Sequence, residues 1–173
     1  MQVTLLAAVS KDNFITDKFE STAWIPKEDA EHLSSYLKKC DALVMGRNTF
    51  HAERYRFATN SKAKRFVLST TKPNKQDEQL ATFYNMSLSS LINELKKTGH
   101  KHVAIVGGTK LCTEAVKESL ANDVVLTRVP IMLHEGKHLF SLAKVMDDFE
   151  HYSLFAKSKL SNHATIEHYT IQS

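Results

Sequence analysis

Cysteine is scarce in this chain of 173 residues, which contains only Cys40 and Cys112. Two cysteines are too few for a disulfide framework, and they do not form a C-x-x-C metal motif. A reducing cytoplasm is therefore the simplest compartment. The nine histidines form neither an H-x-E nor an H-E-x-x-H pattern, and the P-C-x-x-C motif of zinc deaminases is missing. We expect no metal site.

Long apolar runs and glycine motifs are missing as well. Residues 1–9 lack the basic region and the apolar length of a signal peptide, and no window approaches the length of a membrane span. None of the five glycines has G-x-G-x-x-G or G-x-x-x-x-G-K-[ST] spacing, which argues against a standard dinucleotide-binding fold and a P-loop. We therefore expect a soluble protein without a membrane partner.

The charges present are nearly balanced and spread out. There are 23 Lys and Arg against 19 Asp and Glu, with a pI near 9.0. This charge suits phosphorylated ligands without requiring nucleic acid. The basic clusters at residues 62–65 and 100–102 are short and lack interleaved aromatic residues, so we expect no nucleic-acid partner. A hydrophobic content of 42% can bury one core, and we expect a single domain over residues 1–173.

Strand-like and helix-like patterns alternate along the chain, as in an α/β fold with a mostly parallel central sheet covered by helices. We expect strands at residues 3–10, 42–45, 65–68, 81–84, 103–106 and 123–131, and helices at residues 26–39, 87–98 and 110–120. Residues 151–160 and 164–171 predict a C-terminal antiparallel hairpin that closes the sheet. The connection 11–25 is long and is therefore a candidate flap.

Two of the predicted strands end in glycine and precede a helical pattern. One ends at Gly46-Arg47-Asn48-Thr49 and the other at Gly107-Gly108. Glycine lets a ligand approach the backbone closely, and the first N–H groups of a helix attract anions. Two such ends suggest a long ligand with several phosphates. The alternatives are an ordinary strand-to-helix turn with an exposed arginine at the first end, and at the second end a glycine pair that only makes a tight turn or lets a helix pack close.

Several segments resemble, in order and at compatible spacing, the dihydrofolate reductase superfamily. They are Ala7-Ala8-Val9-Ser10 with Ile15 and Trp24, Val44-Met45-Gly46-Arg47-Asn48-Thr49-Phe50, Val67-Leu68-Ser69-Thr70, Val106-Gly107-Gly108 and Leu126-Thr127. Residues 126–140, which include Pro130, Gly136 and Leu139-Phe140, are similar to the C-terminal reductase domain of the bifunctional riboflavin-biosynthesis deaminase-reductase and its stand-alone relatives. The resemblance implies a three-layer dihydrofolate-reductase-like fold.

The resemblance also implies an NADPH-dependent oxidoreductase that transfers a hydride to a small pterin- or pyrimidine-like substrate. The reaction most like it is that of the riboflavin-biosynthesis 5-amino-6-(5-phosphoribosylamino)uracil reductase. Dihydrofolate reduction is an alternative, although residues 61–65 offer no clear match to the arginine that binds the folate glutamate. A protein that binds NADP without catalysis is an alternative from another class.

Cofactor positions follow from the same resemblance. The implied NADPH-binding residues are Ala8 and Ile15 at the nicotinamide, Gly46, Arg47, Asn48 and Thr49 at the pyrophosphate and adenosine phosphate, Ser69, Thr70, Thr71 and Lys72 at the ribose 2′-phosphate, and Val106, Gly107, Gly108, Thr109, Lys110 and Leu111 at the second phosphate-binding turn. Asn13 stands where relatives of the riboflavin branch often have glycine.

Asp29 is the candidate catalytic residue. It follows Trp24 by five positions, the spacing of the tryptophan and the substrate-binding carboxylate in many dihydrofolate reductases. Alternatively, Asp29 only favours the start of a helix. Trp24, Phe50 and Thr127 are candidate substrate-binding residues, where Trp24 is alternatively a core residue and Thr127 alternatively pairs within its strand.

A homodimer is expected from the apolar residues 129–133 and from the unpaired backbone edge of the C-terminal hairpin. Relatives of the riboflavin branch commonly pair through their sheets. Internal burial of residues 129–133 is the competing explanation.

Overall fold

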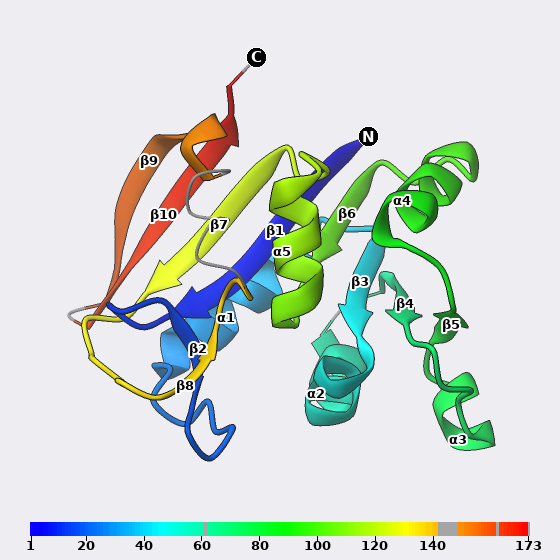
Figure 1. The fold of residues 1–173 in the computed structure, drawn as a ribbon, viewed down its shortest axis with the longest axis horizontal. Helices are drawn as coiled ribbons and strands as arrows, with labels where there is room; N and C mark the ends of the chain where they lie inside the picture. The colour runs from blue at the N-terminus through cyan, green and yellow to red at the C-terminus, as the bar shows by residue number, and fades with distance from the viewer. Residues whose placement is uncertain (61, 142–148, 162, 173) are drawn as a thin grey trace.

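The central feature of the fold is an eight-stranded sheet (Figure 1). The computed structural model describes residues 1–60, 62–141, 149–161 and 163–172, with the backbone alone for residues 54–60. The strands lie in the order β5-β4-β3-β6-β1-β7-β10-β9. Their bounds are β1 (Gln2–Val9), β3 (Ala42–Gly46), β4 (Lys64–Leu68), β5 (Thr82–Tyr84), β6 (His102–Ile105), β7 (Asp123–Arg128), β9 (Tyr152–Ser161) and β10 (Ala164–Ile171).

The pairing within the sheet confirms the predicted fold class. Strands from β5 to β7 are parallel to one another, whereas β10 runs antiparallel to β7 and forms the terminal hairpin with β9. Strand β7 ends at Arg128, three residues earlier than expected. Pro130 lacks an N–H group and cannot continue the ladder.

Helices cover both faces of the sheet and make three layers. Their bounds are α1 (Lys27–Leu37), α2 (Arg47–Asn60), α3 (Lys75–Glu78), α4 (Leu88–Lys97) and α5 (Thr109–Lys117), with a 3-10 turn at Phe149–His151. Residues of α4 and α5 belong to one buried cluster, and residues of α1 and α2 to the other. In Figure 1, α5 lies in front of the sheet and α1 behind it. No helix in the described ranges is long and apolar enough to cross a bilayer.

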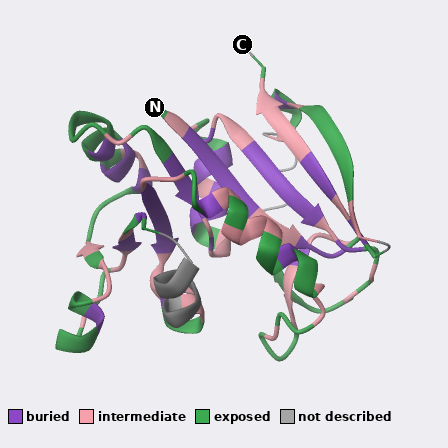
Figure 2. Cartoon of the chain, turned by 180° about the vertical axis from the view of Figure 1, so that it is seen from behind, coloured by how far each residue is buried: buried purple, intermediate pink, exposed green. Residues whose placement is uncertain are grey.

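Alternation along the strands explains why the sequence builds two cores. In β1, Leu5 packs into the cluster with α4 and α5, while its neighbour Leu6 packs into the cluster with α1 and α2. Successive side chains of a strand point to opposite faces, so a strand covered on both faces is apolar throughout. Figure 2 shows β1 and β7 buried along most of their length, whereas β9 is largely exposed.

A second, two-stranded sheet occupies part of the expected flap. Strand β2 (Phe14–Asp17) pairs antiparallel with β8 (Gly136–His138). Gly136 allows this pairing, because a Cβ atom there would lie 1.9 Å from the carbonyl oxygen of Thr16. Strands β2 and β8 and helix α3 were not predicted from the sequence, because each of the three is four residues or shorter and has no clear periodicity. Both strands lie below the end of β1 in Figure 1.

Candidate active site

A cavity of about 1050 Å³ lies where β1, β3, β4, β6 and β7 end. The carboxyl ends of parallel strands meet at one edge of a sheet, which is where ligands bind in open α/β folds. Most of the residues predicted from sequence line this cavity, namely Ala8, Ile15, Asp29, Gly46, Arg47, Asn48, Thr49, Ser69, Thr70, Thr71, Val106, Gly107, Gly108, Thr109, Lys110, Leu111 and Thr127. The fold therefore gathers segments that are far apart in the sequence.

The two glycine-bearing strand ends touch each other. The amide of Gly46 donates to the carbonyl of Gly107 at 2.9 Å. A Cβ atom on Gly108 would lie 3.3 Å from Thr49 Oγ1, and one on Gly107 would lie 3.5 Å from the same atom. Glycine thus lets the first turn of α2 pack closely against the turn before α5. Helix α2 begins at Arg47 and α5 at Thr109, so the N-termini of both helices lie at the cavity.

Arg47 connects the first of these turns with the loop after β4. Its Nη1 donates to the carbonyls of Thr71 at 3.2 Å and Lys72 at 3.3 Å. Within the loop, Ser69 Oγ donates to the carbonyl of Thr71 and accepts from its amide. The arginine therefore positions a loop rich in hydroxyl groups. Lys72 is not among the residues lining the cavity and contributes a backbone carbonyl to this arrangement.

Asp29 and Thr127 form a buried polar pair at the cavity wall. Asp29 lies in the first turn of α1 and is 7% exposed, and Thr127 lies on β7 and is 3% exposed. Thr127 Oγ1 donates to Asp29 Oδ1 at 2.5 Å. A carboxylate with so little access to water needs such a partner. The contact joins α1 to the sheet, so Asp29 does more than favour the start of a helix.

Trp24 and Phe50 are not among the residues that line the cavity. Phe50 is fully buried in the core beneath α2, where its ring meets that of Phe83 edge-on at 5.2 Å. An aromatic residue in the first turn of α2 points toward the sheet, which corrects its expected contact with substrate. The half-buried Trp24 donates its indole N–H to the carbonyl of Ser21. Trp24 thus orders the loop that contributes Ser21 to the cavity wall.

Glu20, His32 and Lys137 also line the cavity and were not predicted from the sequence. Lys137 Nζ lies 2.6 Å from Glu20 Oε1. Lys137 reaches the cavity only because β8 pairs with β2, a contact between segments more than a hundred residues apart. Residue spacing carries no signal for such a pairing.

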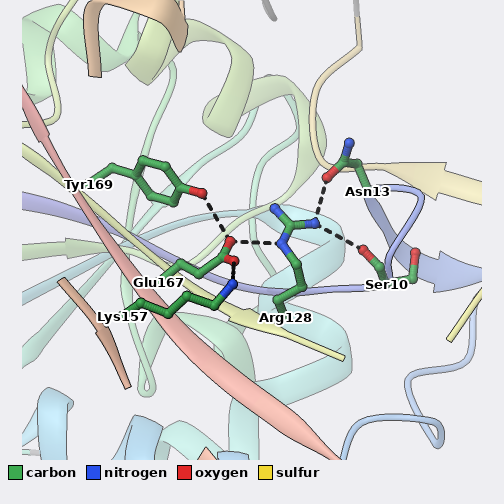
Figure 3. A network of polar contacts seen from close by, with 6 residues as sticks. All are labelled: Ser10, Asn13, Arg128, Lys157, Glu167 and Tyr169. Carbon is green, nitrogen blue, oxygen red and sulfur yellow. Dashed lines mark hydrogen bonds and ion pairs between the residues drawn. The ribbon is translucent and has the colours of Figure 1, made fainter. Parts of the chain in front are cut away.

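A polar network fixes the turn that precedes β2 (Figure 3). Arg128 donates through Nε to Glu167 at 2.7 Å and through Nη1 to Asn13 Oδ1 at 3.0 Å and to the carbonyl of Ser10. Asn13 has a φ of 65°, a left-handed conformation that asparagine tolerates better than most residues do. Asparagine can therefore hold this conformation, at a position where the resemblance leads us to expect glycine.

Glu167 is the centre of that network. It accepts hydrogen bonds from Arg128, Lys157 and Tyr169, at 2.7 to 2.9 Å. Burial disfavours the charged form of Glu167, but the hydrogen bonds from these three residues outweigh it and hold the pKa of the carboxyl below its usual value. The glutamate is therefore ionised at neutral pH.

Cys112, the fourth residue of α5, also lines the cavity. Burial raises the pKa of its thiol to about 12, so the side chain stays neutral at physiological pH. Across the described parts of the chain, no three His, Cys, Asp or Glu side chains lie close enough together to hold a metal ion.

Residues 1–168 match the family model of the RibD C-terminal domain. Two proteins of Bacillus subtilis (strain 168) are similar in sequence, and both are uncharacterised. YyaP is 28% identical over 152 residues, which cover 80% of each chain. YwjB is 24% identical over 143 residues, which cover 80% of this chain and 82% of YwjB.

Solved structures share the fold. A protein of Shewanella sp. PV-4, described as a putative riboflavin biosynthesis protein, superimposes with a TM-score of 0.81 at 24% identity, with full coverage of both chains. The deaminase/5-amino-6-(5-phosphoribosylamino)uracil reductase of Thermotoga maritima gives 0.79 at 16% identity, over 99% of this chain and 56% of that one. Dihydrofolate reductase of Enterococcus faecalis, complexed with NADP(H), gives 0.77 at 16% identity, over 99% and 97% of the two chains.

Proposed function

This chain belongs to the RibD C-terminal domain family, and from that premise we propose that it is an NADPH-dependent reductase. Its substrate is a small pterin- or pyrimidine-like molecule, and the reaction most like it is the reduction of 5-amino-6-(5-phosphoribosylamino)uracil in riboflavin biosynthesis. One observation carries the proposal: the buried Asp29–Thr127 pair and the two glycine-bearing turns line the same cavity.

The residues at the strand ends fit a dinucleotide with three phosphates. Gly46 and Gly107 line the cavity, and the N–H groups at the starts of α2 and α5 suit the negative charge of a pyrophosphate. Ser69, Thr70 and Thr71 offer hydroxyl groups to a 2′-phosphate, in a loop positioned by Arg47. Ala8 and Ile15 supply the wall for the nicotinamide.

NADPH, when bound, supplies the hydride, and the protein supplies position and a proton path. Thr127 donates to Asp29 Oδ1, so Oδ2 would be the oxygen that contacts the substrate. An N–H or amino group of a heterocycle donates to this oxygen, which fixes the ring. Reduction of a C=N or C=O group also requires a proton at the heteroatom, and Asp29 would take this proton from water and deliver it there.

The Asp29–Thr127 pair also favours the first alternative, dihydrofolate reduction, because it would orient a pterin ring equally well. The second alternative is an NADP-binding protein without catalysis. A fluorescence titration with NADPH tests cofactor binding for all three. NADPH oxidation is then measured with dihydrofolate and with 5-amino-6-(5-phosphoribosylamino)uracil. Turnover of one substrate selects that reductase, binding without turnover selects the non-catalytic reading, and failure to bind NADPH refutes the proposal.

A further inference from the structure

An ion pair at the cavity wall joins two residues that are not among the predicted cofactor residues. It joins Lys137 on β8 to Glu20 in the loop after β2, at 2.6 Å, and both side chains line the cavity. Asp29 and His32 of α1 line the same cavity. The lysine therefore borders the cavity in which the proposed function places the substrate.

The backbone around Lys137 is anchored from several directions. Its amide donates to Thr16 Oγ1 at 3.3 Å, and the carbonyl of His138 accepts from Thr109 Oγ1 at 2.6 Å. The ring of His138 also stacks on Phe14, with 3.9 Å between the ring centroids. These contacts fix the position from which the Lys137 side chain extends.

Glu20 is held less firmly than its partner. It lies in a turn with a φ of 60°, and its amide donates to the carbonyl of Asp17 within the same loop. The side chains of Glu20 and Lys137 are 67% and 43% exposed. Water screens an ion pair this exposed, so another anion can replace the carboxylate at little cost.

Arg47 and Lys110 also line the cavity, at the turns assigned to the cofactor. Arg47 donates to the carbonyls of Thr71 and Lys72, and Lys110 lies in the first turn of α5 beside the proposed phosphate site. We propose that Lys137 binds an anionic group of the substrate, a phosphate or a carboxylate, and that Glu20 occupies this place until the substrate displaces it. This inference rests on the proposed function and adds a specificity-determining residue to it.

Recognition then takes place at two points. A polar edge of the heterocycle meets Asp29, and an anionic substituent of the same molecule meets Lys137 through a charge-assisted hydrogen bond. The carboxylate of Glu20 swings into water when the anion arrives. A neutral heterocycle gains only the first contact, so the site discriminates by charge.

Isothermal titration calorimetry of the NADP⁺-loaded protein tests the inference with two pairs of probes. Uridine 5′-monophosphate against uridine reports on phosphate, and 6-carboxypterin against pterin reports on carboxylate. We expect the charged member of at least one pair to bind about tenfold more tightly than the neutral one. Lys137→Gln should abolish this preference, and Glu20→Gln should increase it about threefold by removing the competing carboxylate.

The chain offers a matched control in the same region. Lys18 and Glu135 form another ion pair between the loop after β2 and the segment before β8, at 3.8 Å, with both side chains exposed. Neither lines the cavity. Lys18→Gln and Glu135→Gln therefore change net charge as the test variants do, and they should leave the preference unchanged.

Equal binding of the charged and neutral probes by the wild type would overturn the inference, as would a preference that survives Lys137→Gln or that Lys18→Gln also removes. Absence of binding by all four probes at millimolar concentration counts against it too. NADPH affinity is measured on the same variants. If the wild type does not bind NADPH, the proposed function fails by itself, whereas a weaker NADPH affinity in Lys137→Gln would assign the lysine to the cofactor.

Discussion

Asp29 and Thr127 are 98 positions apart, yet they share a 2.5 Å hydrogen bond at the cavity wall. The spacing between Trp24 and Asp29 pointed to the carboxylate from sequence alone, but it could not identify the partner. Pairing of Thr127 with the carboxylate depends on α1 packing against β7, which is a property of the fold. The proton path that we propose depends on this one hydrogen-bonded pair.

We predict that Asp29→Asn lowers the rate of hydride transfer by about 10²–10⁴-fold, the usual contribution of a general acid, while NADPH affinity stays nearly constant. Asparagine keeps the size of the side chain but cannot supply the proton. Stopped-flow measurement of NADPH oxidation and a fluorescence titration separate the two quantities. Glu28→Gln, an exposed neighbour, is the control. Full turnover combined with a lower melting temperature would make Asp29 a purely structural residue.

We propose that cofactor discrimination depends on Arg47. The predicted Ser69–Lys72 loop needs its bonds to the carbonyls of Thr71 and Lys72 to hold its shape. We predict that the protein binds NADPH at least about tenfold more tightly than NADH, equal to roughly 1.4 kcal/mol. Arg47→Ala should weaken NADPH binding by about 1.5–3 kcal/mol and reduce the preference. Equal dissociation constants for NADPH and NADH in the wild type would contradict the assignment of this loop.

At the scale of elements, local patterns predicted well wherever one segment determines its own ends. Ser87 caps α4 through a bond from the amide of Ser90, the buried stripe of α4 contains Leu91 and Leu95, and Gly99 ends the turn after it with a φ of 84°. The β2–β8 sheet was missed because its two short strands find each other only across the folded molecule. The wall around Glu20 and Lys137 was missed for the same reason.

The network joining β7, β9 and β10 predicts a sensitivity to acid. The pKa of Glu167 is lower in the folded protein than in the unfolded chain, where a glutamate has a pKa of about 4.3. Its contribution to the free energy of unfolding is therefore fully present above that unfolded value and is lost as pH falls through the folded pKa. Chemical denaturation at a series of pH values should show this loss in the wild type and a weaker dependence in Glu167→Gln. Identical pH profiles would disprove the role.

At the scale of the molecule, the sheet is covered on both faces but open at one long edge. Strand β9 is the outer strand, and its exposed side chains include Leu154 at 51% and Phe155 at 72% (Figure 2). The segment 129–133 is buried only in part, because Val129 is buried whereas Met132 is half exposed. Internal burial thus accounts for only part of its apolar character. An unpaired edge with apolar side chains favours association.

We therefore predict a homodimer formed through the β9 edge. Sedimentation at tens of micromolar should give about twice the monomer mass of 19.6 kDa. Phe155→Lys places a charge on the exposed edge and should shift the protein toward monomer without lowering its melting temperature, whereas the distant Met86→Lys should not. A wild type that sediments as the monomer would refute the dimer.

A single cooperative thermal transition would support our proposal that residues 1–173 form one domain.

The hydrogen bond from Thr109 to the carbonyl of His138 connects the start of α5 with β8. A dinucleotide at the glycine turns and an anion at Lys137 would thus act on opposite sides of one bond. Suppose that one ligand, by moving that bond, changes the affinity for the other ligand by some factor. Thermodynamic linkage then requires the second ligand to change the affinity for the first by the same factor. The two halves of the cavity would then be cooperative, and Thr109→Val would separate them by leaving two independent binding equilibria.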